Sequence, residues 1–345
     1  MAIRVRTVMF SILGLLVLLL LGAITAIGWQ VVLGPKMRPV TARHFDSSPA
    51  RLERGKYVVE SVASCFHCHS GHDLSTPEYL TADNQKGEGW ELPIPELGSI
   101  VAPNITPDKE TGIGLWTDDE IARAIQEGVD KDGRPLFPVM PWMNFRQMSD
   151  EDLASVVVYL RSIPPLKHVV PVTKLVFPLS LIVKTIPEPL VTPVAQKTRT
   201  TPAERGEYLM TVAGCRDCHS TQDSKGTPLP GMDLAGGNLF HDPSDPSKHV
   251  FSQNITMDAS GIAHYDEAFF IQTLRAGRLP GRTLTHIMPF EYYRNMADED
   301  LAAIFAYIQT VPHVQHRITN TDTPALCPLD GQTHGLGDKN KKKGS

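Results

Sequence analysis

The sequence lacks an excess of charge of either sign. Its 345 residues contain 33 Lys and Arg against 38 Asp and Glu, a formal net charge of -5, which gives no support for nucleic-acid binding. It also lacks a strand-rich region, so we expect a mainly α fold. The apolar fraction of 41%, with 28 prolines and 26 glycines, fits compact domains joined by irregular loops rather than a disordered chain.

Cysteine is scarce, and four of the five cysteines lie in two short motifs. Residues 65–69 read CFHCH and residues 215–219 read CRDCH. Two thiols at this spacing can form thioethers to the vinyl groups of one porphyrin, and the following histidine can ligate its iron. The sequence therefore predicts two covalently bound haem c groups, held by Cys65, Cys68, His69, Cys215, Cys218 and His219. We assign no chemistry to the fifth cysteine, Cys327.

Two other interpretations of a Cys-x-x-Cys pair need to be weighed. The two pairs could complete one zinc site, or each could be a thioredoxin-like redox dithiol. A zinc site leaves the histidine after each pair unexplained, and the 150 residues between the pairs exceed zinc-ribbon spacing. A redox dithiol would be expected between a strand and a helix, whereas a helical pattern precedes each motif here. Haem attachment is the interpretation that we favour.

The two motifs belong to a longer internal repeat. RGKY at 54–57 returns as RGEY at 205–208, and Asn104-Ile105-Thr106 returns 150 residues later as Asn254-Ile255-Thr256. Matches in one fixed order over more than 100 residues indicate two copies of a domain. We predict an N-terminal anchor at 1–34, a tether at 35–47, cytochrome c domains at 48–165 and 201–315, a Pro-rich apolar linker at 166–200 and a C-terminal tail at 316–345.

An uncharged apolar run extends over residues 8–33 and follows Arg4 and Arg6. It exceeds the roughly 20 residues needed to cross a bilayer, and the positive-inside rule places the two arginines in the cytoplasm. We therefore expect a single N-terminal transmembrane helix in the inner membrane, with the haem domains facing the periplasm. A cleaved signal peptide is the alternative. The apolar centre of the linker, residues 175–183, either packs between the domains or forms a patch against the membrane or another subunit.

The ligand opposite each histidine decides what the iron can do. A methionine thioether in that position gives a six-coordinate site suited to electron transfer. The repeat pairs Met140-Pro141 with Met288-Pro289, and Met148 with Met296. Met148 and Met296 precede the last helix of each copy, where an apolar residue usually packs into the core. Met140 and Met288 lie in Pro-rich loops that can return over a haem, so we predict iron ligation by His69 with Met140 and by His219 with Met288.

Residues 49–313 resemble the class I cytochrome c superfamily. They are most similar to the membrane-bound cytochrome c subunits of bacterial alcohol, gluconate, sorbitol and fructose dehydrogenases. The resemblance rests on RGxY before CxxCH, on NITPD, GRPLFPVMP and MSDEDLASVVVYLRSIP. It implies that the histidine of CxxCH and the methionine of Met-Pro are the axial ligands. Those subunits generally carry three haems, whereas this chain has two motifs.

The expected function is the transport of single electrons in a respiratory chain, with no catalytic residues in the chain itself. We expect a dehydrogenase or quinol-oxidising complex as the electron donor, and an oxidase or soluble cytochrome as the acceptor. The alternative is a dihaem enzyme such as a peroxidase or a thiosulfate dehydrogenase. Such an enzyme needs an exchangeable or unusual ligand on one iron, and the duplicated Met-Pro loops argue against one.

Overall fold

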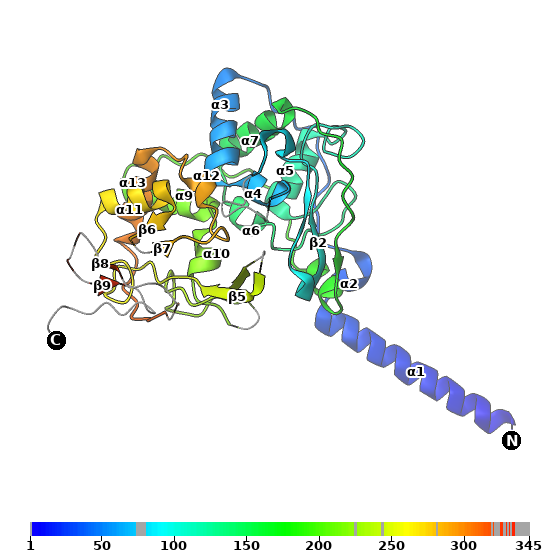
Figure 1. Cartoon of the computed structure of the whole chain (residues 1–345). Coiled ribbons are helices and arrows are strands. Elements are labelled where there is room, and N and C mark those ends of the chain that lie inside the picture. The colour runs from blue at the N-terminus through cyan, green and yellow to red at the C-terminus, as the bar shows by residue number, and fades with distance from the viewer. Residues whose placement is uncertain are drawn as a thin grey trace.

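The structure is a computed structural model that describes residues 2–73, 81–223, 226–242, 245–280, 282–318, 320, 325–326, 329, 331 and 333–334. It is helical with several short strands, and a long helix, α1 (Ala2–Ile27), projects from the body (Figure 1). The prediction of a mainly α fold is corrected by the presence of these short strands. The long loops between helices satisfy part of their backbone hydrogen bonding by pairing in short antiparallel ladders.

The helices form two equivalent sets, one after the other along the chain. The first set consists of α3 (Pro49–Tyr57), the π-helix η1 (Val58–Val62), α4 (Cys65–His69), α5 (Asp118–Glu127), α6 (Trp142–Phe145) and α7 (Asp150–Ser162). The second set consists of α9 (Pro202–Val212), α10 (Cys215–His219), α11 (Glu267–Ala276), α12 (Phe290–Tyr293) and α13 (Asp298–Ile308). We call these sets the first half and the second half. The domain boundaries themselves stay a prediction.

The remaining elements are short. They are α2 (Gln30–Leu33), α8 (Leu179–Ile182), the 3-10 turns η2 (Asp83–Gln85), η3 (Pro95–Leu97) and η4 (Val183–Thr185), and the strands β1 (Trp90–Leu92), β2 (Gly98–Ala102), β3 (Lys174–Leu175), β4 (Leu239–Asp242), β5 (Asp245–Phe251), β6 (Arg278–Leu279), β7 (Arg282–Thr283), β8 (Ala325–Leu326) and β9 (Thr333–His334). Strands β1, β2 and β3 form one antiparallel sheet, in which Trp90 pairs with Ala102 and Gly98 with Leu175. The other strands pair as hairpins.

Side-chain caps fix where several helices begin. Thr117 and Glu120 form a capping box at the start of α5, and Thr201 forms a second one with Glu204 at the start of α9. Asp266 accepts a hydrogen bond from the Phe269 amide at 2.8 Å and so begins α11. Gly128 ends α5 in the left-handed region with φ 68°. These local signals place the helices before any tertiary contact is considered.

One glycine in each half allows two helices to cross closely. A Cβ atom at Gly55 in α3 would lie 2.0 Å from the Ser155 carbonyl oxygen of α7, and one at Gly206 in α9 would lie 1.9 Å from the Ala303 carbonyl oxygen of α13. No side chain larger than hydrogen fits at such a separation. The glycine of the RGxY repeat is therefore required by helix packing.

The two halves exchange tyrosine hydrogen bonds across their interface. The Tyr57 hydroxyl of the first half donates to the Asp300 carboxylate of the second, and accepts from the Ala297 amide at 3.0 Å. Reciprocally, Tyr208 donates to the Asp152 carboxylate and accepts a hydrogen bond from the backbone of the first half. Buried apolar side chains of both halves join one continuous core. The same contact is therefore made twice, as in an isologous interface.

The membrane predictions are corrected. In the part of the chain that the structure describes, no helix combines the length and the apolar character needed to cross a bilayer. The predicted N-terminal transmembrane helix, the membrane contact through it and the single-pass inner-membrane localisation are therefore wrong.

The linker packs against the first half of the chain. Its strand β3 pairs with β2, and the Lys184 ammonium donates to the Val31 carbonyl at 3.1 Å. Val183 is buried, whereas Phe177 is 80% exposed. The apolar centre of the linker therefore leaves Phe177 at the surface. Most of the predicted C-terminal tail, with Cys327, lies outside the described residues.

Candidate functional site

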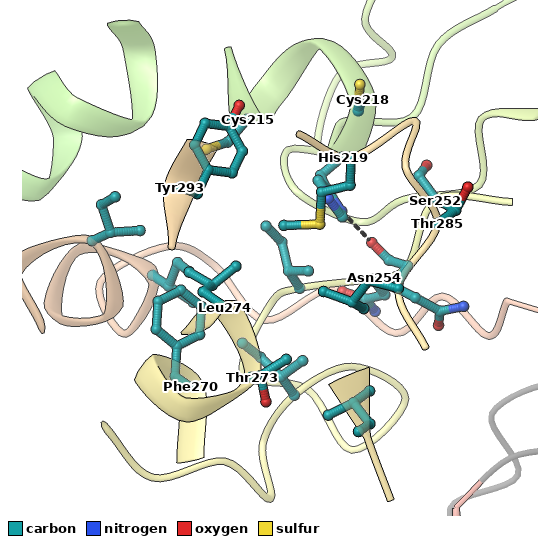
Figure 2. Close-up of a pocket in the computed structure, with 18 of the residues that line it drawn as sticks. Cys215, Cys218, His219, Ser252, Asn254, Phe270, Thr273, Leu274, Thr285 and Tyr293 are labelled. Carbon is teal, nitrogen blue, oxygen red and sulfur yellow. Dashed lines mark hydrogen bonds between the residues drawn. The ribbon is translucent and has the colours of Figure 1, made fainter. Parts of the chain in front are cut away.

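A cavity of about 640 Å³ lies inside the second half, next to the second Cys-x-x-Cys-His motif. Its volume falls in the range of roughly 300–1,000 Å³ typical of cofactor sites. Figure 2 shows Cys215, Cys218 and His219 of α10 at one side, with Phe270, Thr273 and Leu274 of α11 across the cavity. Most of the lining is apolar. It includes Met210, Ile255, Ile262, Phe269, Ile287, Met288, Tyr293, Met296 and Ile304.

The two motif histidines are oriented by the same backbone contact. The Nδ1 atom of His219 lies 2.8 Å from the Gln253 carbonyl oxygen, a bond drawn as a dashed line in Figure 2. The Nδ1 atom of His69 lies 2.7 Å from the Pro103 carbonyl oxygen. A carbonyl partner requires a proton on Nδ1, so Nε2 of each ring is left with the lone pair that a metal ligand needs. Both rings are therefore prepared to bind a metal through Nε2.

Burial controls the charge of these histidines. It lowers the pKa of His69, and the hydrogen bond to Pro103 opposes this only in part. The pKa of His219 is lowered for the same reason, with Gln253 opposing. Because the usual histidine pKa is near 6.5, both rings are neutral at neutral pH. A neutral imidazole is the form that binds metal.

The four motif cysteines are half-buried thiols that form no disulfide with one another. Burial raises the pKa of Cys65 to about 12 and that of Cys68 to about 11. It also raises the pKa of both Cys215 and Cys218 to about 12. A redox-active dithiol has a lowered pKa instead, because its thiolate is the nucleophile. The redox-dithiol alternative is therefore disfavoured.

The zinc alternative also lacks support from the geometry. In residues 2–73, 81–223 and the later described segments, no cluster of three or more His, Cys, Asp and Glu side chains is placed to hold a metal ion. A Cys₄ zinc site needs four thiolates around one ion. The two cysteine pairs do not form such a site.

The candidate methionine ligands lie in equivalent turns. The Met140 amide donates to the Phe137 carbonyl at 3.0 Å, and the Met288 amide donates to the Thr285 carbonyl at 3.1 Å. Both side chains are partly buried against the core, and Met288 lines the cavity together with His219. Met148 and Met296 are 1% exposed core residues, as expected for residues preceding a helix, although Met296 also borders the cavity. The cavity lining alone does not choose between Met288 and Met296.

The repeated Asn-Ile-Thr segments hold the loops beside the histidines. Asn104 Oδ1 accepts from the Thr106 amide at 2.9 Å, while its Nδ2 donates to the Leu166 carbonyl at 2.7 Å. Asn254 makes the same pair of bonds, with the Thr256 amide at 2.9 Å and the Val314 carbonyl at 2.8 Å. Each asparagine ties its loop to the segment after the last helix of its half. Asn254 also lines the cavity.

Several lining residues have no sequence motif to identify them. Tyr293 lines the cavity from α12, and its hydroxyl donates to the Ala213 carbonyl at 2.6 Å. Phe270 and Leu274 line it from α11. The repeat is the one signal that could have found Tyr293, because it pairs with the buried Phe145. The carbonyl partners of the histidines could not be found from sequence, because every residue has a carbonyl.

Comparison with known families identifies one part of the chain directly. Residues 52–164 match the family model for cytochrome c. The chain contains a cytochrome c domain. Such a domain carries covalently bound haem c and serves electron transport, which confirms the predicted class of cofactor and the predicted family.

Curated relatives extend the similarity beyond this cytochrome c domain. The chain is 26% identical over 328 residues, 90% of this chain and 65% of the relative, to "Alcohol dehydrogenase (quinone), cytochrome c subunit" of Gluconobacter oxydans. It is 27% identical over 296 residues, 79% of this chain and 56% of the relative, to "Fructose dehydrogenase cytochrome subunit" of Gluconobacter japonicus. The chain thus spans less than two thirds of the length of these two relatives.

A relative of more similar length is a "Diheme cytochrome c-type" protein of Cereibacter sphaeroides. The chain is 25% identical to it over 284 residues, which cover 79% of this chain and 89% of that protein. The residues around the second motif fit haem c. An apolar cavity, a neutral histidine with its Nε2 available, two unpaired thiols and a thioether meet in one place.

Proposed function

We propose that this chain is a dihaem cytochrome c that carries single electrons for a dehydrogenase complex of a respiratory chain. Cys65, Cys68 and His69 would hold one haem with Met140, and Cys215, Cys218 and His219 would hold the other with Met288. Haem c supplies an iron that changes between the ferrous and ferric states by one electron. The partner dehydrogenase is inferred from the printed names of the relatives.

The observation that carries the proposal is the duplicated orientation of the histidines. His69 and His219 each use Nδ1 on a backbone carbonyl, at 2.7 Å and 2.8 Å. A fixed Nδ1 bond sets the ring plane and raises the basicity of Nε2 toward the metal. With Met140 and Met288 as the second ligands, the two sites would suit an iron that keeps both ligands while it changes charge. Such ligation favours electron transfer over the binding of a small substrate.

The chain's own part in the function is to bind and orient the haem and to exclude water from it. The motif thiols would anchor the porphyrin, and Phe270, Leu274 and Tyr293 would provide apolar walls around it. A low-dielectric surrounding is one of the features by which a protein sets a haem potential. No side chain of the cavity is assigned a proton-transfer role, because one-electron transfer breaks and forms no bond.

Mass spectrometry of the holoprotein tests the haem number. We expect the wild-type chain to exceed its sequence mass by two haem groups, and the Cys215→Ala/Cys218→Ala variant to exceed it by one. A wild-type mass with one haem or none would overturn the dihaem proposal.

Ligand binding tests the choice between carrier and enzyme. Both sites of an electron carrier should leave the spectrum unchanged when cyanide or peroxide is added to the isolated holoprotein. Rapid cyanide or peroxide binding at one haem would instead favour a dihaem peroxidase or thiosulfate dehydrogenase.

A further inference from the structure

The two Cys-x-x-Cys-His motifs each touch the opposite half of the chain. Asn144 of α6, in the first half, donates from Nδ2 to the Asp217 carboxylate of the second motif at 2.6 Å. Tyr292 of α12, in the second half, meets His67 of the first motif edge to face, with ring centroids 5.9 Å apart and planes at 80°. Each motif is therefore contacted by the short helix that follows the Met-Pro turn of the other half.

These two contacts are made by equivalent positions of the two halves. His67 and Asp217 both stand two residues after the first cysteine of their motif, and Asn144 and Tyr292 both stand four residues after the methionine of Met-Pro. Contacts between the same positions in both directions are those of an isologous interface. The Tyr57 and Tyr208 hydrogen bonds follow the same reciprocal pattern.

The neighbouring elements bring the motifs themselves close together. Helix α12 packs on η1, which leads into the first motif, and α6 packs on α9, which leads into the second. A Cβ atom at Gly214, directly before Cys215, would lie 3.5 Å from the Asn144 Nδ2 atom. Each motif therefore lies beside an element of the opposite half.

We propose that the His67–Tyr292 and Asp217–Asn144 contacts set the spacing of the two haem edges and thereby the rate of electron exchange between the halves. This inference rests on the proposed dihaem function. The step moves one electron from the reduced iron of one half to the oxidised iron of the other. No bond forms or breaks, and no proton is required. His67 and Asp217 would be positioning residues.

The contacts differ in chemistry, which makes them separable by mutation. Removing Asn144 breaks a hydrogen bond to a carboxylate, and removing Tyr292 breaks an aromatic edge contact. Neither residue is an expected iron ligand. Met143 and Asn295 provide a matched control, because both are exposed and adjoin the same short helices.

The experiment compares holoprotein variants after reduction by less than one electron per chain. In the wild type we expect a first-order redistribution between the two haems whose rate does not depend on protein concentration. The Asn144→Ala/Tyr292→Ala variant should redistribute at least about tenfold more slowly, because displacements of an ångström affect reaction rates strongly. The Met143→Ala/Asn295→Ala variant should keep the wild-type rate. Haem content and the potential of each haem are measured on the same samples.

The outcomes separate this inference from the proposed function. An unchanged redistribution rate in Asn144→Ala/Tyr292→Ala, with two haems and unchanged potentials, would overturn the inference and leave the dihaem carrier intact. A wild-type chain with fewer than two haems would overturn the proposed function itself. If the double variant does not fold, Asp217→Ala removes one contact at an exposed position, and an unchanged rate there would also contradict the inference.

Discussion

At the scale of single residues, the proposed function depends on which side-chain atoms already form hydrogen bonds. Nδ1 of His69 and of His219 is bound to a carbonyl, so Nε2 is the atom left to a metal. Asn104 and Asn254 are equally constrained, because each uses Oδ1 on its own loop and Nδ2 on the segment after the last helix of its half. None of these contacts requires a charged side chain. The site is therefore insensitive to the modest net charge of the chain.

The methionine assignment can be tested one residue at a time. Replacing Met140 or Met288 by Ala should abolish one methionine-to-iron absorption feature and lower the potential of that haem, because a thioether ligand raises the potential. Absorption spectra and a redox titration measure both effects. Unchanged spectra would instead assign the iron ligand to Met148 or Met296. If these two methionines are core residues only, replacing either by Ala should lower the unfolding free energy by about 2–5 kcal/mol, because a cavity is left in the core.

The loss of folding stability at acidic pH should depend on Asp152. Burial acts to raise the pKa of its carboxyl, but the hydrogen bonds from Arg54 and Tyr208 outweigh burial and hold the pKa below its usual value. A carboxyl with a depressed pKa contributes stability above its unfolded pKa of about 4, and this is lost as the pH falls through the folded value.

The Asp152→Asn variant should accordingly lose roughly 2 kcal/mol of unfolding free energy at pH 7. It should also show a weaker fall in stability below about pH 4 than the wild type. Denaturant titrations between pH 7 and pH 3 measure both quantities. Parallel pH profiles for the two proteins would contradict the assignment.

At the scale of elements, caps and glycines decide how the helices are placed. The Thr117 capping box and the Asp266 cap fix where α5 and α11 begin. Gly55 and Gly206 then allow the first and last helices of each half to cross in near contact. The predicted repeat therefore contains packing information in its glycine as well as the Cys-x-x-Cys-His spacing.

Substitution of these glycines should be costly in both halves. We expect Gly55→Ala and Gly206→Ala each to lower the unfolding free energy by about 1–3 kcal/mol or more, because the added methyl group would overlap a backbone oxygen. Gly71→Ala is a suitable control, since its Cβ would meet nothing closer than the flexible Glu88 carboxylate at 3.5 Å. Thermal unfolding measures all three, and equal melting temperatures would refute the packing argument.

At the scale of the whole molecule, the two halves behave as one body through paired contacts. The tyrosine exchange, the shared core and the contacts at the two motifs all cross the same interface. We expect Tyr57→Phe and Tyr208→Phe each to cost about 1–2 kcal/mol, because each leaves a carboxylate with one donor fewer.

The double variant Tyr57→Phe/Tyr208→Phe should also unfold less cooperatively. Tyr159→Phe is the control, since its hydroxyl bonds to Glu60 within the first half and should lower stability without uncoupling the halves. Calorimetry distinguishes one transition from two. A single transition of unchanged width in the double variant would show that these hydroxyls do not couple the halves.

The sequence by itself determined the chemistry of this protein. Spacing alone marks Cys65, Cys68 and His69 and their repeats, because covalent attachment and ligation are local. The order of the helices follows from caps and periodicity in the same way. The sequence could not predict the short strands of the loops, and its apolar N-terminal run led to a membrane helix that the described structure does not support.

The tertiary structure alone decided how the parts face one another. That Gln253 and Pro103 orient the histidines, and that Asn144 and Tyr292 reach the opposite motif, depends on segments far apart in the chain. A backbone carbonyl has no residue-type signature, and a contact between halves has no fixed spacing in sequence. Local pattern specifies what binds, whereas long-range packing specifies which atom is presented and to which neighbour.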